Sequence, residues 1–274
     1  MTTDGAASGT VAILGAGVMG ETLLSGLLRA GRRPDDVVVA ERRPDRAAEI
    51  AARHGVRVLG NAEAASLADT VVLVVKPQDV EGVLAEIRDA VTPGTLVVSI
   101  AAGIPTAFVE QRLAGGVAVV RAMPNTPALV GEGMTAISPG ACCLPEHTGR
   151  AEAMLAAMGA VLRVPEYQQD AVTAVSGSGP AYVFYVAEAM IEAGVLLGLP
   201  RATATELAVQ TLLGAARMLK ETGTHPTLLR EQVSSPGGTT VAALRQLDDH
   251  GVRAAFVTAI EAARDRSQEL SPTT

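Results

Sequence analysis

Aromatic residues, cysteines and charged residues are all scarce in this chain. Only 2% of its 274 residues are aromatic and none is tryptophan, so a core must be built from Ala, Val and Leu. The two cysteines, Cys142 and Cys143, are neighbours, which rarely form a structural disulfide, and this predicts a reducing, cytoplasmic setting. The net charge of -7 argues against a nucleic-acid partner, because phosphate binding needs clustered Lys and Arg.

Long apolar runs and targeting segments are also missing. The first ten residues are small and polar, so no signal peptide is expected. The apolar stretch at residues 181–199 is interrupted by Glu188 and Glu192, and no uninterrupted run reaches the ~20 residues of a membrane span. We therefore expect no membrane partner, and we expect the apolar residues to be buried inside the chain or between subunits. Residues 271–274 are expected to form a frayed tail.

Short β-branched runs alternate with helical stretches in the first part of the chain. Helices are expected at residues 21–30, 45–54, 80–90 and 104–113. The expected strands lie at residues 11–14, 37–40, 57–59, 70–75, 96–100 and 117–122, with two more near the edge of the domain at 134–138 and 161–164. Continuous apolar strands separated by helices predict an α/β fold, in which a doubly wound, Rossmann-like parallel sheet is covered on both faces.

Helices replace the β-branched runs after about residue 165. These helices are rich in Ala and Leu, and they are expected at residues 181–197, 202–221, 227–232, 240–248 and 252–270. We place the boundary at this change of character. The prediction is a Rossmann-like domain at residues 1–164 and an all-helical domain at residues 165–274.

A glycine-rich motif, G-x-G-x-x-G, directly follows the first expected strand. It comprises Gly15, Gly17 and Gly20, with Val18 and Met19 before the last glycine. The first glycine permits a tight turn, the second lets the backbone approach a pyrophosphate, and the third lets the helix pack close to the strand. The free N–H groups at the start of the helix attract phosphate. The motif therefore predicts a dinucleotide site.

The end of the second expected strand bears on the choice of cofactor. Glu41 stands where an acidic residue would bind the ribose diol of NADH, but Arg42 and Arg43 follow at once. Guanidinium groups at this place can clamp the 2′-phosphate of NADPH. Two arginines in a short loop outweigh one carboxylate that can point away, so NADPH is favoured and NADH stays possible.

The fourth expected strand runs into Val75, Lys76 and Pro77. In an open parallel sheet, ligands sit beyond the carboxyl ends of the strands. These three residues are therefore expected to approach the cofactor, although Lys76 is equally compatible with a plain surface position.

Three other segments have compositions that packing alone does not require. They are residues 121–127 (RAMPNTP), 176–182 (SGSGPAY) and 234–240 (SSPGGTT). The last two open helices with small residues and free N–H groups, which is a ready site for an anion. Ordinary N-capping by Ser or Thr is the alternative explanation for each.

Together these segments resemble the pyrroline-5-carboxylate reductase family over nearly the whole chain. The similar motifs are VAILGAGVMG, VVKP, RAMPNTP, AVSGSGPAY and LLREQVSSPGGTTVAALRQLD. The resemblance implies reduction of 1-pyrroline-5-carboxylate, a cyclic imino acid, to L-proline by NAD(P)H. It also implies that the first domain binds the nucleotide, that the helical domain dimerises, and that the substrate lies at the domain and subunit interface.

The resemblance further implies which residues act on the substrate. Thr240 would place its hydroxyl on the ring nitrogen, and Ser235 would be the second catalytic residue. Backbone N–H groups around Ser235, Gly238 and Thr239 are candidates to hold the substrate carboxylate. The other substrate-binding positions would be Gly237 and Ser178.

The same resemblance adds residues to the cofactor site. Asn61 would approach the ribose–phosphate region of the cofactor. Met123, Pro124 and Asn125 would lie near the nicotinamide. No metal site is expected.

Hydride transfer to a protonated imine does not demand a strong general acid, because the hydride neutralises a positive charge that is already there. A site without histidine is therefore plausible. The four histidines lie outside every motif and are expected to be structural or at the surface: His54, His147, His225 and His250.

Two other functions fit part of the pattern. A reductase similar to the β-hydroxyacid dehydrogenases would rely on a catalytic lysine in a long helix, but the only lysine after Lys76 is Lys220, near the end of an expected helix, where it complements the helix dipole. A non-catalytic dinucleotide sensor would bind NADPH without turnover and would not need the segment SSPGGTT.

Overall fold

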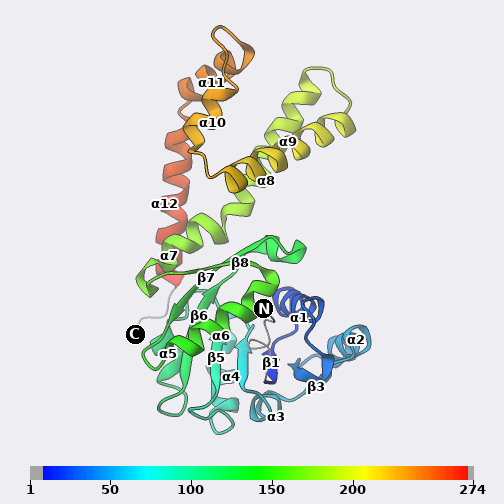
Figure 1. Cartoon of the computed structure of the whole chain (residues 1–274), viewed down its shortest axis with the longest axis vertical. Helices are drawn as coiled ribbons and strands as arrows, with labels where there is room; N and C mark the ends of the chain where they lie inside the picture. Colours follow the sequence, from blue (N-terminus) through cyan, green and yellow to red (C-terminus); the bar gives the residue numbers. More distant parts are fainter. Residues whose placement is uncertain (1–8, 271–274) are drawn as a thin grey trace, which may run out of the picture. The chain divides into compact units, whose positions relative to one another are not determined.

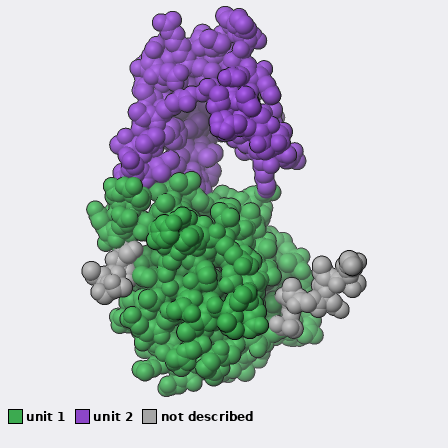
Figure 2. Space-filling model, turned by 60° about the vertical axis from the view of Figure 1, so that its left-hand side comes forward, with its two compact units in different colours: residues 1–177, 263–274 green, residues 178–262 purple. Residues whose placement is uncertain are grey.

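The computed structural model describes residues 9–270, and Figure 1 shows its elements. The predictions of an absent signal peptide and of a frayed tail bear on residues that lie wholly or largely outside this range. The chain divides into two compact units, which are coloured separately in Figure 2. Unit 1 contains the residues up to 177 and those from 263 onward, and unit 2 contains residues 178–262.

Unit 1 is built on an eight-stranded sheet (Figure 1) with the order β3-β2-β1-β4-β5-β6-β7-β8. Every neighbouring pair is parallel except β6 and β7, which are antiparallel. The first six strands have the order of a doubly wound dinucleotide-binding fold, so the predicted α/β class is confirmed. The strands are β1 (Val11–Leu14), β2 (Val37–Ala40), β3 (Arg57–Leu59), β4 (Thr70–Leu73), β5 (Leu96–Ser99), β6 (Ala118–Met123), β7 (Gly133–Pro139) and β8 (Gly159–Arg163).

The helices of unit 1 agree less closely with the sequence patterns than the strands do. Helix α5 is shorter than predicted at both ends, and Pro105, which is its N-cap, accounts for the later start. Helices α3 and α6 were not predicted, and α6 begins at a proline and contains Gly149, which weakens its helical pattern. The helices are α1 (Val18–Arg29), α2 (Pro44–His54), α3 (Asn61–Ser66), α4 (Val80–Ile87), α5 (Thr106–Glu110), α6 (Pro145–Leu155) and α7 (Gln169–Val172).

Short helical turns lie between these elements. A single π-helical turn, Thr173–Gly177, follows α7 directly. Such turns are rare and often lie at functional sites. The 3-10 turns are η1 (Pro34–Asp36), η2 (Pro77–Asp79), η3 (Thr126–Val130), η4 (Ala156–Met158) and η5 (Glu166–Gln168).

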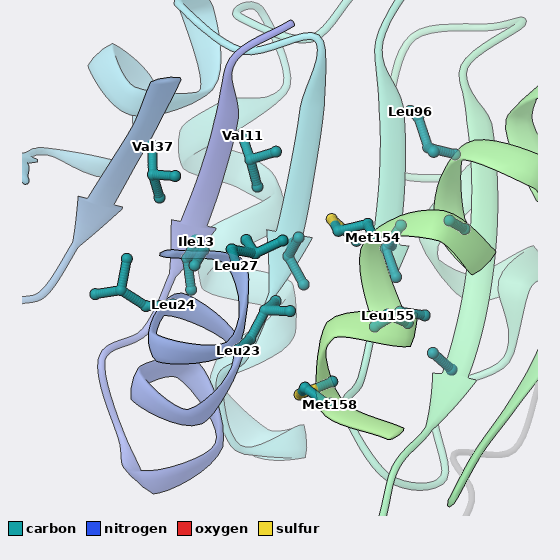
Figure 3. Packing of buried hydrophobic residues seen from close by; sticks show 14 of the residues in the cluster. Val11, Ile13, Leu23, Leu24, Leu27, Val37, Leu96, Met154, Leu155 and Met158 are labelled. Atoms are coloured by element: carbon teal, nitrogen blue, oxygen red, sulfur yellow. The ribbon is translucent and has the colours of Figure 1, made fainter. Parts of the chain in front are cut away.

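The core of unit 1 has two layers, one on each face of the sheet. Successive strand residues point to opposite faces, so Val11 and Ile13 of β1 pack in one layer and Ala12 and Leu14 in the other. Figure 3 shows the first layer, where α1 and the segment from Met154 to Met158 cover the strands. The sheet is therefore buried on both faces in its centre, which fixes the strand ends that carry the candidate site.

The compact units divide 13 residues later than the predicted boundary at residue 164. The segment after β8 stays with unit 1 because Glu166 accepts hydrogen bonds from the amide and the hydroxyl of Thr106, both at 2.7 Å. The last turns of the C-terminal helix also join unit 1, where the hydroxyl of Ser267 donates to Asp170 at 2.7 Å. The functional division of the chain at residue 164 stays a prediction.

Unit 2 is helical, as predicted (Figure 1). Helices α8 and α9 lie together closely enough that a Cβ atom on Gly194 would stand 2.9 Å from the Cβ of Ala204. The helices are α8 (Gly179–Leu196), α9 (Arg201–Thr222), α10 (Pro226–Gln232), α11 (Thr239–Asp249) and α12 (Val252–Leu270), the last of which continues into unit 1. Across residues 9–270, each helix is too short or too polar to cross a membrane.

Unit 2 leaves many large apolar side chains exposed. Within residues 178–262, only Ala204 and Ala208 are buried apolar residues. By contrast, the exposed fractions of Phe184, Tyr185 and Leu196 are 67%, 74% and 88%. So many large apolar side chains exposed in a folded chain indicate a surface that another protein surface covers.

Candidate active site

The carboxyl ends of β1, β2 and β4 meet at one edge of the sheet, beside a cavity of about 290 Å³. This is the point where the strand order reverses, and ligands of doubly wound sheets bind at such points. Eight residues that the sequence singled out line the cavity: Gly15, Gly17, Glu41, Arg42, Arg43, Asn61, Val75 and Lys76. The structure therefore brings together residues as far apart in the chain as Gly15 and Lys76.

The glycine-rich loop has the geometry that close approach of a phosphate requires. Gly15 has a φ of +110°, and a Cβ atom there would lie 2.5 Å from the carbonyl oxygen of Val74. A Cβ atom on Gly20 would lie 2.0 Å from the carbonyl oxygen of Gly15, so only glycine lets α1 pack this close. Gly17 is the N-cap of α1 and faces open space. The loop thus fits a pyrophosphate at the start of α1.

The loop after β2 holds Glu41 inward. The Glu41 carboxylate accepts hydrogen bonds from the backbone amide of Arg43 at 3.0 Å and from its Nε at 3.1 Å. Its side chain is only 9% exposed. Burial alone would raise the pKa of Glu41, but the hydrogen bonds from Arg43 lower it below its usual value. A charged carboxylate is therefore fixed at this end of β2.

Three more charged groups, Arg42, Lys76 and Asp79, complete the cavity wall. The guanidinium of Arg42 pairs with the carboxylate of Asp79, with 3.4 Å between Nη2 and Oδ1. Lys76 precedes the short turn η2, which carries Asp79 at its end. Asn61 donates from its side-chain amide to Glu86 at 2.7 Å. With Glu41 and Arg43, the wall holds three cations and two carboxylates.

Seven of the predicted cofactor residues do not line this cavity. Val18 is exposed and borders a separate hollow of about 210 Å³ on α1, whereas Met19 packs against the core and Gly20 is buried. Pro77 begins η2 beside the cavity. The other three follow one another at the carboxyl end of β6: Met123, Pro124 and Asn125. Because β6 is parallel to β5, they lie at the same edge of the sheet, and their contact with a cofactor stays a prediction.

Asn125 joins two of the segments that the sequence singled out. Its side-chain nitrogen donates to the carbonyl oxygen of Ser176 at 3.1 Å, and its side-chain oxygen accepts from the amide of Met134 at 2.8 Å. The methyl group of Met123 packs at Gly177, where a Cβ atom would be 2.8 Å away. Residues 121–127 therefore fix the π-helical turn that leads into α8.

A cluster of charged side chains on α1 and α2 holds the glycine-rich loop in place. Arg46 of α2 donates from Nε to the carbonyl oxygen of Ala16 at 3.0 Å, and it also pairs with Glu21 in the first turn of α1. Arg53 and His54 bind the same carboxylate, at 2.6 and 3.0 Å. Burial alone would raise the pKa of Glu21. The hydrogen bonds from His54, Arg46 and Arg53 outweigh this effect and lower the pKa to about 2.

Replacing Glu21 with glutamine is expected to lower the free energy of unfolding at neutral pH by about 1–3 kcal/mol, because Arg46, Arg53 and His54 lose the negatively charged acceptor of their hydrogen bonds. A carboxyl group whose pKa is lowered by folding stabilises the protein above its unfolded pKa, and that stabilisation is lost as the pH falls. The difference between wild type and Glu21→Gln should therefore shrink between pH 4.5 and about 2. Urea unfolding at several pH values measures it.

Glu63→Gln is the matched control, since Glu63 is an exposed carboxylate in the first turn of α3. An equal loss in both variants, or a difference that does not depend on pH, would contradict the role assigned to Glu21.

In unit 2, the segment SSPGGTT forms a tight turn before α11. The amide of Gly238 donates to the carbonyl oxygen of Ser235 at 2.9 Å, and Gly237 has a φ of +67°. Proline second and a left-handed glycine third are the pattern of a type II turn. The amide of Gly238 is thus used inside the turn in this structure, and its role as a donor to the substrate carboxylate stays a prediction. The prediction for Thr239 is not affected.

Both candidate helix starts lack the side-chain cap that would explain them as ordinary N-termini. Gly238 is the N-cap of α11, so Thr240 is the second residue of the helix and not its cap. Ser178 is the N-cap of α8, but its hydroxyl makes no capping hydrogen bond with the described residues. Capping therefore does not account for Ser178 or Thr240.

The histidines and Lys220 have the structural positions that the sequence predicted. His54 binds Glu21, His147 accepts from the amide of Leu144, His225 caps α10 and His250 contacts the carbonyl oxygen of Gln246. Lys220 lies in the last turn of α9. Among residues 9–270, no group of three or more His, Cys, Asp or Glu side chains could hold a metal ion.

Comparison with known proteins decides the family. Residues 166–270 match the model of "Pyrroline-5-carboxylate reductase dimerisation", and residues 10–103 match that of "NADP oxidoreductase coenzyme F420-dependent". A pyrroline-5-carboxylate reductase of Corynebacterium melassecola is 49% identical over 265 residues, which cover 95% of this chain and 98% of the relative. The chain belongs to the pyrroline-5-carboxylate reductase family.

Solved structures of pyrroline-5-carboxylate reductases match nearly the whole chain. That of Coxiella burnetii has a TM-score of 0.92 and 38% identity, and the match covers 97% of this chain and 99% of the other. A Plasmodium falciparum pyrroline carboxylate reductase with NADP bound has a TM-score of 0.87 and 27% identity, with 98% and 100% covered.

The sequence motifs did not indicate every residue that lines the cavity of this pyrroline-5-carboxylate reductase family member. Gln78, Asp79 and Val83, which follow Lys76 and Pro77 in the chain, were not predicted. The rule that ligands bind beyond strand ends points to this segment, but it does not say how far the lining extends. No sequence signal indicated Arg46, whose contacts depend on how α2 packs against α1.

Proposed function

We propose that this chain reduces the C=N bond of 1-pyrroline-5-carboxylate with NAD(P)H and so forms L-proline, the last step of proline biosynthesis. The observation that carries the proposal is the 49% identity to a pyrroline-5-carboxylate reductase over 95% of the chain. The reduced nicotinamide supplies the hydride when it is bound. The residues of the chain bind, orient and shield the reactants.

The glycine-rich loop is proposed to hold the cofactor pyrophosphate against the first turn of α1. Gly15 and Gly20 let the backbone come close, and Arg46 keeps the loop in place through Ala16. Asn61, Val75, Lys76 and Pro77 would contact the ribose and phosphate region, while Val18, Met19, Met123, Pro124 and Asn125 would contact the remainder of the cofactor.

We propose NADPH as the preferred cofactor, with NADH as an accepted alternative. Arg42 and Arg43 both reach the cavity, and the Glu41 carboxylate is turned toward Arg43. A carboxylate held in this way is less able to bind a ribose diol, whereas two guanidinium groups favour a 2′-phosphate. The NADP-bound relative of Plasmodium falciparum supports the same preference.

The turn before α11 is proposed to bind the substrate. The free amides at the start of the helix, including that of Thr239, would hold the carboxylate of the cyclic imino acid. The hydroxyl of Thr240 would contact the ring nitrogen, with Ser235 as the second catalytic residue and Ser178 and Gly237 as further contacts. Because the iminium already carries positive charge, positioning contributes more to the rate than acid–base strength.

We further propose that residues 165–274 form the dimerisation and substrate domain, that residues 1–164 form the nucleotide domain, and that the enzyme acts in the cytoplasm. The match of residues 166–270 to a dimerisation model supports the division. The unpaired thiols of Cys142 and Cys143 support a reducing compartment.

The chain is expected to sediment as a dimer or a higher homo-oligomer at micromolar concentration. The apolar side chains that α8 and α9 expose would make the isolated chain poorly soluble, and burying them offsets the entropy cost of association. Analytical ultracentrifugation measures the mass. A compact monomer that turns over substrate would rule out the proposed assembly.

The reaction itself is tested by mixing the purified protein with NADPH or NADH and with 1-pyrroline-5-carboxylate. The nicotinamide absorbance should fall only when the imino acid is present. No oxidation of either nucleotide by folded protein would reject the proposed function.

A further inference from the structure

The two arginines of the cofactor cavity are held by their carboxylate partners in different ways. Arg43 and Glu41 share two hydrogen bonds, and the Glu41 side chain is 9% exposed. Arg42 and Asp79 share a single contact of 3.4 Å, with side chains 67% and 35% exposed. The first pair is a fixed part of the loop, whereas the second can open at little cost.

Asp79 is placed to act on Arg42 rather than on its own helix. It is the N-cap of α4, a position where aspartate commonly accepts a backbone N–H, yet its side chain makes no capping hydrogen bond. The backbone of Asp79 is held by its amide, which donates to the carbonyl oxygen of Lys76 at 2.9 Å. The carboxylate instead faces Arg42, which comes from the end of β2, two strands away from β4 in the sheet.

We propose that Asp79 sets the preference between NADPH and NADH by competing with the 2′-phosphate for Arg42. This inference rests on the proposed function, since it takes the cavity to be the cofactor site. The 2′-phosphate of NADPH carries close to two negative charges, so it must draw Arg42 away from Asp79 in order to bind it. NADH has no group that needs Arg42. Asp79 therefore weakens NADPH selectively and keeps NADH competitive.

Direct binding measurements test the proposal without relying on turnover. In Asp79→Asn, the Kd for NADPH should fall roughly fivefold, as expected for an exposed ion pair, while the Kd for NADH should change less than about twofold. Titration followed by nicotinamide fluorescence gives both constants. Equal shifts for the two nucleotides, or weaker binding of NADPH, would overturn the role of Asp79.

Asp36→Asn is the matched control. Asp36 also pairs with an arginine, Arg33 at 2.8 Å, but it stands before β2 rather than after it. This variant should leave both dissociation constants unchanged. If it tightens NADPH as much as Asp79→Asn does, the effect is one of net charge and the proposal fails.

A double variant shows whether Asp79 acts through Arg42. When Arg42 is already alanine, adding Asp79→Asn should improve NADPH binding by less than about twofold, because the competed group is gone. A full fivefold gain in that background would contradict competition for Arg42. If the wild type binds neither nucleotide, the proposed function fails together with this inference. If the wild type binds both nucleotides but Asp79→Asn changes the two Kd values equally, only the inference is rejected.

Discussion

Replacing Arg42 and Arg43 together with alanine is expected to weaken NADPH binding by roughly 100-fold or more, because two charge-assisted hydrogen bonds of about 1.5–3 kcal/mol each are lost. NADH should lose far less. Alanine at position 43 also removes the Nε hydrogen bond to the Glu41 carboxylate and keeps only the one from the backbone amide. A carboxylate held by one bond fewer at the end of β2 is better able to accept the ribose diol, which favours NADH.

Isothermal titration of both nucleotides measures this change in preference. The chain provides a control in Arg32→Ala with Arg33→Ala, because these adjacent arginines precede β2 just as Arg42 and Arg43 follow it. The control pair should leave the ratio of the two dissociation constants unchanged. Equal losses of NADPH and NADH in the Arg42 and Arg43 variant would refute the 2′-phosphate assignment.

Thr240→Ala is expected to reduce kcat at least about tenfold, which corresponds to the loss of about 1.4 kcal/mol of transition-state stabilisation. The melting temperature and the affinity for nucleotide should change little. The reason is that Gly238, and not Thr240, is the N-cap of α11, so the threonine hydroxyl does not hold the helix start. A hydroxyl without this structural task is available to the ring nitrogen of the substrate.

Two further variants separate catalysis from folding. Thr240→Ser keeps the hydroxyl and should recover most of the turnover. Thr227→Ala removes a threonine at the equivalent second position of α10 and should leave kcat unchanged. If Thr240→Ala melts earlier yet reduces the imine at the normal rate, Thr240 stabilises the helix and is not catalytic.

Local sequence rules predicted the parts of the site that depend on backbone conformation. Gly15 and Gly20 occupy positions where a side chain would collide with Val74 or with the loop itself. Such positions require glycine, so the glycine spacing in the sequence predicts them. The strands were predicted closely, because burial on both faces requires continuous runs such as VAIL and VVVA. The Rossmann-like half was therefore predictable from residue patterns.

The contacts between distant segments were not predictable in the same way. Asp79 meets Arg42, and Asn125 meets Ser176, only after the sheet has aligned the strands before them. The use of the Gly238 amide inside its own turn likewise depends on the conformation of Gly237. A single sequence does not indicate such pairings, because each of the paired residues, taken by itself, is equally compatible with an exposed position on the surface.

The most direct test of the account is transfer of deuterium from nicotinamide C4 to the product. With 1-pyrroline-5-carboxylate and NADPH deuterated on the transferred face, each turnover should give L-proline with one deuterium on the ring CH₂ bonded to nitrogen, because that carbon is the former imine carbon. Mass spectrometry and NMR of the product locate the label. Nucleotide oxidation that leaves proline unlabelled, or labelled at any other carbon, would contradict hydride transfer to the C=N bond.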